Sequence, residues 1–170
     1  MRSSIFAAIV FAALFCALPV AAKIYIPPGV QADYILVEKA KHELTLFRQG
    51  KILKTYIVAL GRGGLGKKVM EGDKKVPEGV YFIEGRNHHS QYFLSLKISY
   101  PSQGDIERAR LRRVSPGGSI MIHGLRNDLA GLGPSHRKED WTAGCIAVTD
   151  EEILEIWDAV ADGTPIEIKP

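Results

Sequence analysis

Short apolar segments rich in β-branched and aromatic residues recur along the chain, and turn residues separate them. Segments of this kind predict β-strands. Leu44, Leu46 and Ile52 flank a turn at Gln49-Gly50, which predicts a β-hairpin. The other expected strands are residues 34–37, 55–60, 80–83, 92–98, 119–122 and 166–169. We therefore expect one mainly β domain, a β-sandwich or a distorted barrel, with about two helices.

Two segments carry the signals of helices. Residues 105–113 predict a short helix that ends before a Pro-Gly-Gly sequence. Residues 150–161 predict a longer helix, in which Thr149 caps the first turn and Glu152 completes a capping box. The apolar residues of this second helix fall on one face at helical spacing, and they are Ile153, Ile156, Trp157 and Val160.

Two long segments have the composition of loops. Residues 61–78 contain five glycines and one proline, and residues 124–140 contain three glycines and one proline. We expect both segments to be loops. Long ordered loops in a compact domain tend to be functional, so the length of the first is itself a hint of function.

The N-terminus resembles an export signal. Arg2 gives a positive start, residues 5–20 are apolar apart from a break at Pro19, and small residues follow at Val20-Ala21-Ala22. This order predicts a signal peptide at residues 1–22 that is cleaved after Ala22. A linker at 23–32 and one domain at 33–170 would follow, and the mature protein would lie in the periplasm without a membrane anchor. The alternative is an uncleaved anchor, because the apolar segment is about long enough to span a bilayer.

Export would change how the two cysteines are interpreted. Cleavage would remove Cys16 and leave Cys145 without a partner. An oxidising compartment favours paired cysteines, so a single thiol there calls for an explanation. It is either a small buried hydrophobic side chain or a reactive group. The count of cysteines alone does not decide between these two.

The charge pattern excludes some classes of function. The formal net charge is +3, and removal of residues 1–22, which contain Arg2 as their one charged residue, leaves +2. This is too small a charge to indicate nucleic-acid binding, although several basic clusters would suit an anionic substrate. His88-His89 has no Glu-x-x-His partner and no second cysteine, so we expect no metal site.

Cys145 and His123 have the neighbours that cysteine chemistry needs. A cysteine nucleophile requires a base that takes the thiol proton and later delivers it to the leaving amine. His123 is expected at the end of a strand, and Gly124 after it leaves the ring accessible. Cys145 ends the segment Thr142-Ala143-Gly144-Cys145, a tight turn whose backbone N–H groups would stabilise an oxyanion. Gly144 would let that backbone approach a substrate closely.

Together these motifs resemble the L,D-transpeptidase family, also called the YkuD domain. The family's signature is a His-Gly at a strand end, a loop, and then [Ser/Thr]-His-Gly-Cys. This chain has Ile120-Met121-Ile122-His123-Gly124 and then Thr142-Ala143-Gly144-Cys145. Three further parts of the chain resemble the family and occur in its order. The first is Leu44-Thr45-Leu46-Phe47 with Gly50, and the second is Lys68, Glu71-Gly72-Asp73 and Pro77-Glu78-Gly79. The third is Ser99-Tyr100-Pro101, Asp105, Ala109 and Pro116-Gly117-Gly118. The resemblance covers residues 33–170.

The resemblance implies the fold of that catalytic domain, with Cys145 as nucleophile, His123 as general base and no cofactor. Such enzymes act on the tetrapeptide stems of peptidoglycan. The cysteine attacks the carbonyl between a diamino acid and the terminal D-alanine, D-alanine leaves, and a thioester remains. An amine of another stem then forms a crosslink. Water in place of the amine gives a carboxypeptidase, and some relatives attach or release a wall-bound protein.

Two departures from the family pattern affect the site. The signature histidine before Gly-Cys is Ala143 here, and the arginine that often follows two residues after the cysteine is Ala147. The nucleophile and the base remain, but the departures bear on substrate orientation and rate. They keep open a second interpretation, a peptidoglycan-binding module that has lost catalysis.

The segment 124–140 offers a replacement for these missing groups. It carries Ser135-His136-Arg137 shortly before the motif, and its glycines would let it fold over the cleft as a lid. His136 would then occupy the place of the motif histidine, and Arg137 would replace the missing arginine and bind substrate carboxylates. The alternative is that both side chains are solvated, as polar loop residues commonly are.

Overall fold

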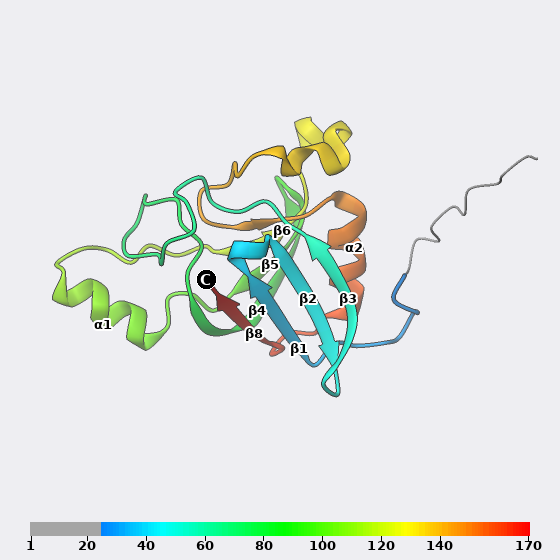
Figure 1. Ribbon diagram of the computed structural model, residues 1–170, viewed down its shortest axis with the longest axis horizontal. Coiled ribbons are helices and arrows are strands. Elements are labelled where there is room, and N and C mark those ends of the chain that lie inside the picture. The colour runs from blue at the N-terminus through cyan, green and yellow to red at the C-terminus, as the bar shows by residue number, and fades with distance from the viewer. Residues whose placement is uncertain (1–24) are drawn as a thin grey trace, which may run out of the picture.

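A computed structural model describes residues 25–170, so the predicted signal peptide at 1–22 lies outside the described residues. Within 25–170, eight strands form a single sheet, which confirms the expected mainly β fold (Figure 1). The strands are β1 (Tyr34–Glu38), β2 (Glu43–Arg48), β3 (Lys51–Ile57), β4 (Gly79–Ser90), β5 (Phe93–Ile98), β6 (Met121–His123), β7 (Ile146–Ala147) and β8 (Pro165–Lys169). The helices are the α-helices α1 (Gln103–Leu111) and α2 (Asp150–Ala159), with the 3-10 segments η1 (Lys39–Lys41) and η2 (Asn127–Lys138).

The sheet has the order β3-β2-β1-β8-β4-β5-β6-β7. Most neighbours are antiparallel, and the parallel pairs are β1 with β8 and β6 with β7. Just beyond β3, the backbone N–H and C=O groups of Ala59 both bond those of Ala147 in β7, at 2.9 Å each. The described strands thus form one open sheet rather than two stacked sheets, and this isolated bridge links the segment after β3 to β7.

Alternation along the strands builds the core. Ile35 and Val37 of β1 are fully buried, and so is Ile166 of β8. The residues that alternate with them along each strand are more exposed. This period of two is the pattern of a strand with one face inward. Helix α2 adds Ile153 and Ile156 to the same core. As expected, Thr149 and Glu152 form a capping box at its start, although the helix ends at Ala159, two residues earlier than predicted.

Other boundaries shift for identifiable reasons. Helix α1 begins at Gln103 and not at 105, because the Ser102 hydroxyl accepts the Asp105 N–H and so caps the first turn. The predicted hairpin exists as β2 and β3, which pair in antiparallel register around Gln49-Gly50. Strand β4 extends well beyond the predicted 80–83, because it pairs with β8 in its first half and with β5 in its second.

The two predicted loops have different outcomes. Residues 61–78 contain no helix and no named strand, as expected. The buried Lys39 ammonium holds this loop in place, because it donates hydrogen bonds to Leu65 O and Glu78 Oε1, at 2.5 Å each. The prediction of a loop at 124–140 is wrong in its centre, where η2 forms two short helical pieces that meet at Gly133. Gly133 has a φ of +48°, so the helical turns break there.

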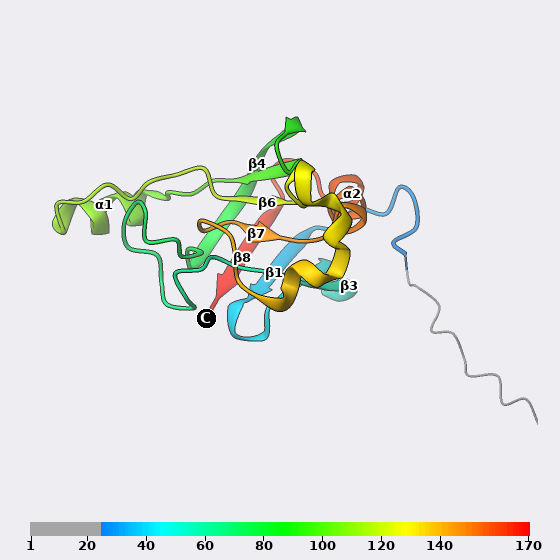
Figure 2. The ribbon, with the colours of Figure 1, turned by 90° about the horizontal axis from the view of Figure 1, so that it is seen from above.

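Figure 2 shows η2 in yellow beside α2 and next to the strands β6 and β7. Helix α1 lies apart from η2 in both views (Figures 1 and 2). The described residues include no helix that is both long and apolar enough to cross a membrane.

Candidate active site

The pairing of β6 with β7 brings His123 and Cys145 to the same face of the sheet. The two strands are parallel, and Ile122 lies opposite Ile146. Both isoleucines are fully buried. Because side chains alternate along a strand, the residue after Ile122 and the residue before Ile146 point to the opposite face. These two residues are His123 and Cys145.

His123 is buried and held in one tautomer. It ends β6, as predicted, and only 3% of its surface is exposed. Its Nδ1 lies 2.7 Å from the Gly124 carbonyl oxygen. A carbonyl can only accept, so Nδ1 carries the proton and Nε2 keeps its lone pair. Burial lowers the pKa of His123 from 6.5 to about 4, so the ring is neutral near pH 7.

Two aromatic side chains enclose the His123 ring. The ring centroids of Tyr92 and His123 are 4.4 Å apart, and Trp141 meets His123 edge to face at 5.6 Å. Tyr92 and Trp141 also stack on each other at 6.2 Å. The three rings form an aromatic cluster, which explains why the imidazole is shielded from solvent.

Thr142 organises the turn that carries Cys145. Its hydroxyl donates to the Cys145 carbonyl at 2.7 Å and accepts from the Gly144 N–H at 3.1 Å. Gly144 has a φ of +125°, and a Cβ there would lie 2.8 Å from the Lys75 carbonyl oxygen. Only glycine fits this position without strain. The tight turn is thus as expected, but one of its N–H groups is already used within the turn.

The Cys145 thiol is a neutral group in this environment. Burial raises its pKa, and a backbone hydrogen bond from Met121 and the charge of Lys68 oppose that rise only in part. The sulfur lies 3.6 Å from the Ser119 carbonyl oxygen, to which the thiol donates. Because the His123 imidazole is also neutral, the two groups are a thiol and a base rather than a thiolate and an imidazolium.

A cavity of about 420 Å³ opens over the two residues. Three of the predicted site residues, His123, Thr142 and Cys145, line this catalytic cavity together. The remaining lining residues are Arg62, Tyr92, Ser119, Met121, Arg126, Leu129, Trp141 and Ala143. Within 25–170, no three His, Cys, Asp or Glu side chains gather as a metal site would require.

Gly124 acts through packing and not as part of the cavity wall. A Cβ at Gly124 would lie 2.6 Å from Asp150 Oδ1 and 3.0 Å from Ile153 Cγ2. The same Asp150 Oδ1 accepts the Leu125 N–H at 2.8 Å. Gly124 therefore lets the chain that leaves His123 run directly against the start of α2.

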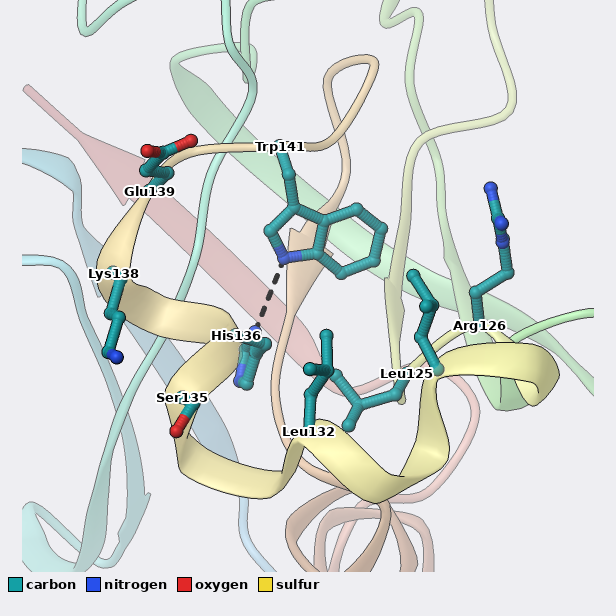
Figure 3. A pocket seen from close by; sticks show the side chains of 9 residues that line it. Leu125, Arg126, Leu132, Ser135, His136, Lys138, Glu139 and Trp141 are labelled. Atoms are coloured by element: carbon teal, nitrogen blue, oxygen red, sulfur yellow. Dashed lines mark hydrogen bonds between the residues drawn. The ribbon is translucent and has the colours of Figure 1, made fainter.

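His136 and Arg137 are not among the residues that line the catalytic cavity. His136 is buried and lines a second cavity of about 480 Å³ beneath η2 (Figure 3). The Arg137 guanidinium donates to the Glu152 carboxylate on α2. Neither residue lines the catalytic cavity, so the wall of that cavity does not support the predicted replacement of the motif histidine and arginine.

Several cavity residues were missed by sequence reasoning. Tyr92 stood only as the first residue of a predicted strand, and Leu129 lay in the segment taken for a loop. Arg62 and Arg126 were noted only among the basic residues that would suit an anionic substrate. Arg62 follows Gly61, which pairs with Thr142, and the Arg62 N–H bonds the Thr142 carbonyl at 3.1 Å. This cation is placed by contacts between distant segments, which no local pattern reveals. For Trp141, its position directly before the motif was the one sequence signal that it lines the cavity.

Comparison with known proteins identifies a matching family. The family model for the L,D-transpeptidase (YkuD) catalytic domain matches residues 32–168. The chain is 31% identical over 134 residues to YafK of Escherichia coli K12, which itself has only a provisional assignment as an L,D-transpeptidase. That match covers 75% of this chain but 46% of YafK, so the chain spans less than half the length of this relative.

Solved structures share the fold at low sequence identity. The helical cell shape determining protein Pgp2 of Campylobacter jejuni superposes with a TM-score of 0.60 and 23% identity, over 89% of this chain and 53% of Pgp2. An L,D-transpeptidase of Xylanimonas cellulosilytica gives a TM-score of 0.54 and 14% identity, over 84% of this chain and 63% of that one. Both similarities concern the fold alone.

The packing at Gly124 gives a testable prediction. Gly124→Ala should destabilise the fold by about 1–3 kcal/mol, because the new methyl group has no room against α2. Gly131→Ala is the matched control, since a Cβ at Gly131 meets no atom within 4 Å. Denaturant unfolding of both variants measures the difference, and equal stabilities would show that Gly124 has no steric role.

Proposed function

The chain belongs to the L,D-transpeptidase catalytic domain family, and on that premise we propose that it is an exported cysteine acyltransferase of peptidoglycan. Membership suggests peptidoglycan crosslinking as the general role. The observation that supports an active enzyme is the shared cavity in which His123, with its lone pair on Nε2, lines the same wall as the Cys145 thiol. The substrate would be the tetrapeptide stem.

In the first half-reaction, His123 acts as the general base. Nε2 takes the thiol proton while Sγ bonds the carbonyl carbon between the diamino acid and the terminal D-alanine. The tetrahedral intermediate then loses its C–N bond, and the imidazolium returns the proton to the departing amine. D-Alanine leaves, and a thioester joins the stem to Cys145.

In the second half-reaction, an amine attacks the thioester carbonyl and loses a proton to Nε2. The C–S bond breaks, the thiol regains its proton, and a new amide crosslinks two stems. Water in the same position gives a free carboxylate and makes the enzyme a carboxypeptidase. The amine of a wall-linked protein is a third possible partner in this step.

The oxyanion of each intermediate needs backbone donors. Because the Gly144 N–H is bonded to Thr142, the N–H groups of Ala143 and Cys145 are the candidates in this turn. Arg62 and Arg126 line the cavity and provide positive charge for the carboxylates of a stem peptide. Thr142 and Gly144 would then act by fixing the turn.

The second candidate function is a wall-binding module without catalysis. The observations that favour it are the raised pKa of the Cys145 thiol and the presence of Ala143 in place of the motif histidine. Such a module would bind peptidoglycan without forming a thioester. Acylation of Cys145 by a stem peptide therefore separates the two functions.

We further propose export to the periplasm, since the proposed substrate lies outside the cytoplasm. The sequence signal at residues 1–22 supports this location. N-terminal sequencing of the protein recovered from the periplasm should begin at Lys23. A membrane-bound form that retains Met1 would instead support an uncleaved anchor.

Removal of the nucleophile tests the function directly. The mature protein, incubated with disaccharide-tetrapeptide, should release D-alanine and form crosslinked or trimmed stems, and mass spectrometry should find an acyl adduct on Cys145. Cys145→Ala should reduce turnover below about one per cent of the wild-type rate, because loss of a nucleophile normally costs several orders of magnitude. Higher residual turnover would mean that another group performs the attack.

Removal of the His123 side chain should change how the reaction rate depends on pH. The wild-type rate should fall as pH drops through about 4, where His123 gains a proton. His123→Ala should be slow near neutral pH, since the buried thiol is then protonated, and should approach wild type at alkaline pH, where the thiol ionises unaided. The measurement is the rate of D-alanine release from disaccharide-tetrapeptide across pH. Parallel profiles for both proteins would exclude His123 as the base.

A further inference from the structure

Trp141 lies between two histidines. On one side its ring edge meets His123 at a centroid distance of 5.6 Å. On the other side its indole N–H donates to Nδ1 of His136 at 3.3 Å, the dashed line in Figure 3. The same indole lines both the catalytic cavity and the cavity beneath η2. Trp141, like Arg126 and Leu129, lines both cavities and therefore forms part of the wall between them.

The bond to Trp141 fixes the state of His136. An indole nitrogen only donates, so Nδ1 of His136 must be the unprotonated acceptor, and the ring proton must sit on Nε2. Burial lowers the pKa of His136 to about 4, and the neighbouring charge of Arg137 adds to this effect. Glu152, which faces the same ring, acts in the opposite direction. The ring is thus neutral near pH 7, and this is the form that can hold Trp141.

The second ring nitrogen of His136, Nε2, indicates which property of the side chain matters. Nε2 is buried and has no hydrogen-bond partner among the described residues. A buried donor without a partner is unfavourable. A phenylalanine would fill the same space without that penalty. The property that histidine supplies at this position, and that phenylalanine lacks, is the acceptor Nδ1.

We propose that His136 is a positioning residue, whose Nδ1 holds the Trp141 indole edge-on against His123 and so keeps water away from the imidazole. This inference builds on the proposed function, in which His123 is the base. It assigns His136 a role through Trp141, distinct from contact with the substrate. Loss of the Nδ1 acceptor would free the indole to turn, join the two cavities and hydrate His123.

The decisive measurement is the titration of His123 itself, which does not depend on turnover. Imidazole signals are followed by NMR between about pH 4.5 and 8, and the His123 signal is identified by its absence in His123→Gln. In the wild type the His123 signal should titrate only at the acid end of this window, because burial lowers its pKa to about 4. In His136→Phe, water reaches the ring, and its midpoint should rise by about one pH unit or more.

Four further variants separate positioning from general structural damage. His136→Asn keeps an oxygen acceptor near the place of Nδ1 and should titrate like the wild type. Trp141→Phe removes the indole donor and should behave like His136→Phe, and the double variant should shift no further because both changes break one contact. His89→Phe, a change at an exposed histidine on β4, is the matched control and should leave the His123 signal unchanged.

The outcomes decide the proposal. It is wrong if His123 in His136→Phe keeps the wild-type titration, or if His136→Asn shifts as far as His136→Phe. Kinetics on the tetrapeptide then test the link to catalysis: His136→Phe should lower kcat more at about pH 5.5 than at about pH 8, with KM unchanged. A shifted His123 signal in a protein without any turnover would refute the proposed function but leave the positioning role established.

Discussion

The parallel contact between β6 and β7 is the constraint on which the site depends. β7 contains only two residues, yet it is bonded on both sides, by β6 and by the bridge to Ala59. The register that sets Ile122 opposite Ile146 directs both isoleucines into the core. A shift of one residue would expose these isoleucines and turn Cys145 into the interior. The hydrophobic core thus enforces the relative placement of the candidate nucleophile and base.

Sequence patterns predicted the parts of the fold that depend on local chemistry. The hairpin at Gln49-Gly50, the capping box at Thr149 and the position of His123 at a strand end all follow from residues close together in the chain. The short strand β7 did not, because two residues give no periodicity and its pairing partners are distant. The helical turns of η2 were missed because its glycines and proline carry the composition of a loop, while its contacts with the rest of the domain favour helical turns.

The site residues likewise divide into those that local sequence predicted and those that only distant contacts bring together. Cys145 and Thr142 were found because the turn that holds them is contiguous in sequence. Tyr92 lies in the turn before β5 and Trp141 lies three residues after the end of η2. Their contact with His123 therefore depends on the whole sheet. The two departures from the family pattern also differ in kind. Ala143 is exposed at the cavity, whereas Ala147 is fully buried and bonded to Ala59, so this chain uses the latter position for packing.

Burial sets the kind of chemistry that this pair can perform. It raises the pKa of the Cys145 thiol and lowers that of the His123 imidazole, so both effects favour the uncharged forms. An enzyme with such a pair would have to move the proton as the substrate arrives, and the attacking sulfur would be activated only when a carbonyl is in place. A resting thiol is also less reactive toward other electrophiles than a thiolate. The aromatic cluster around His123 is thus a determinant of reactivity, because the same rings that exclude water from the imidazole also keep the proton on the sulfur until it is needed.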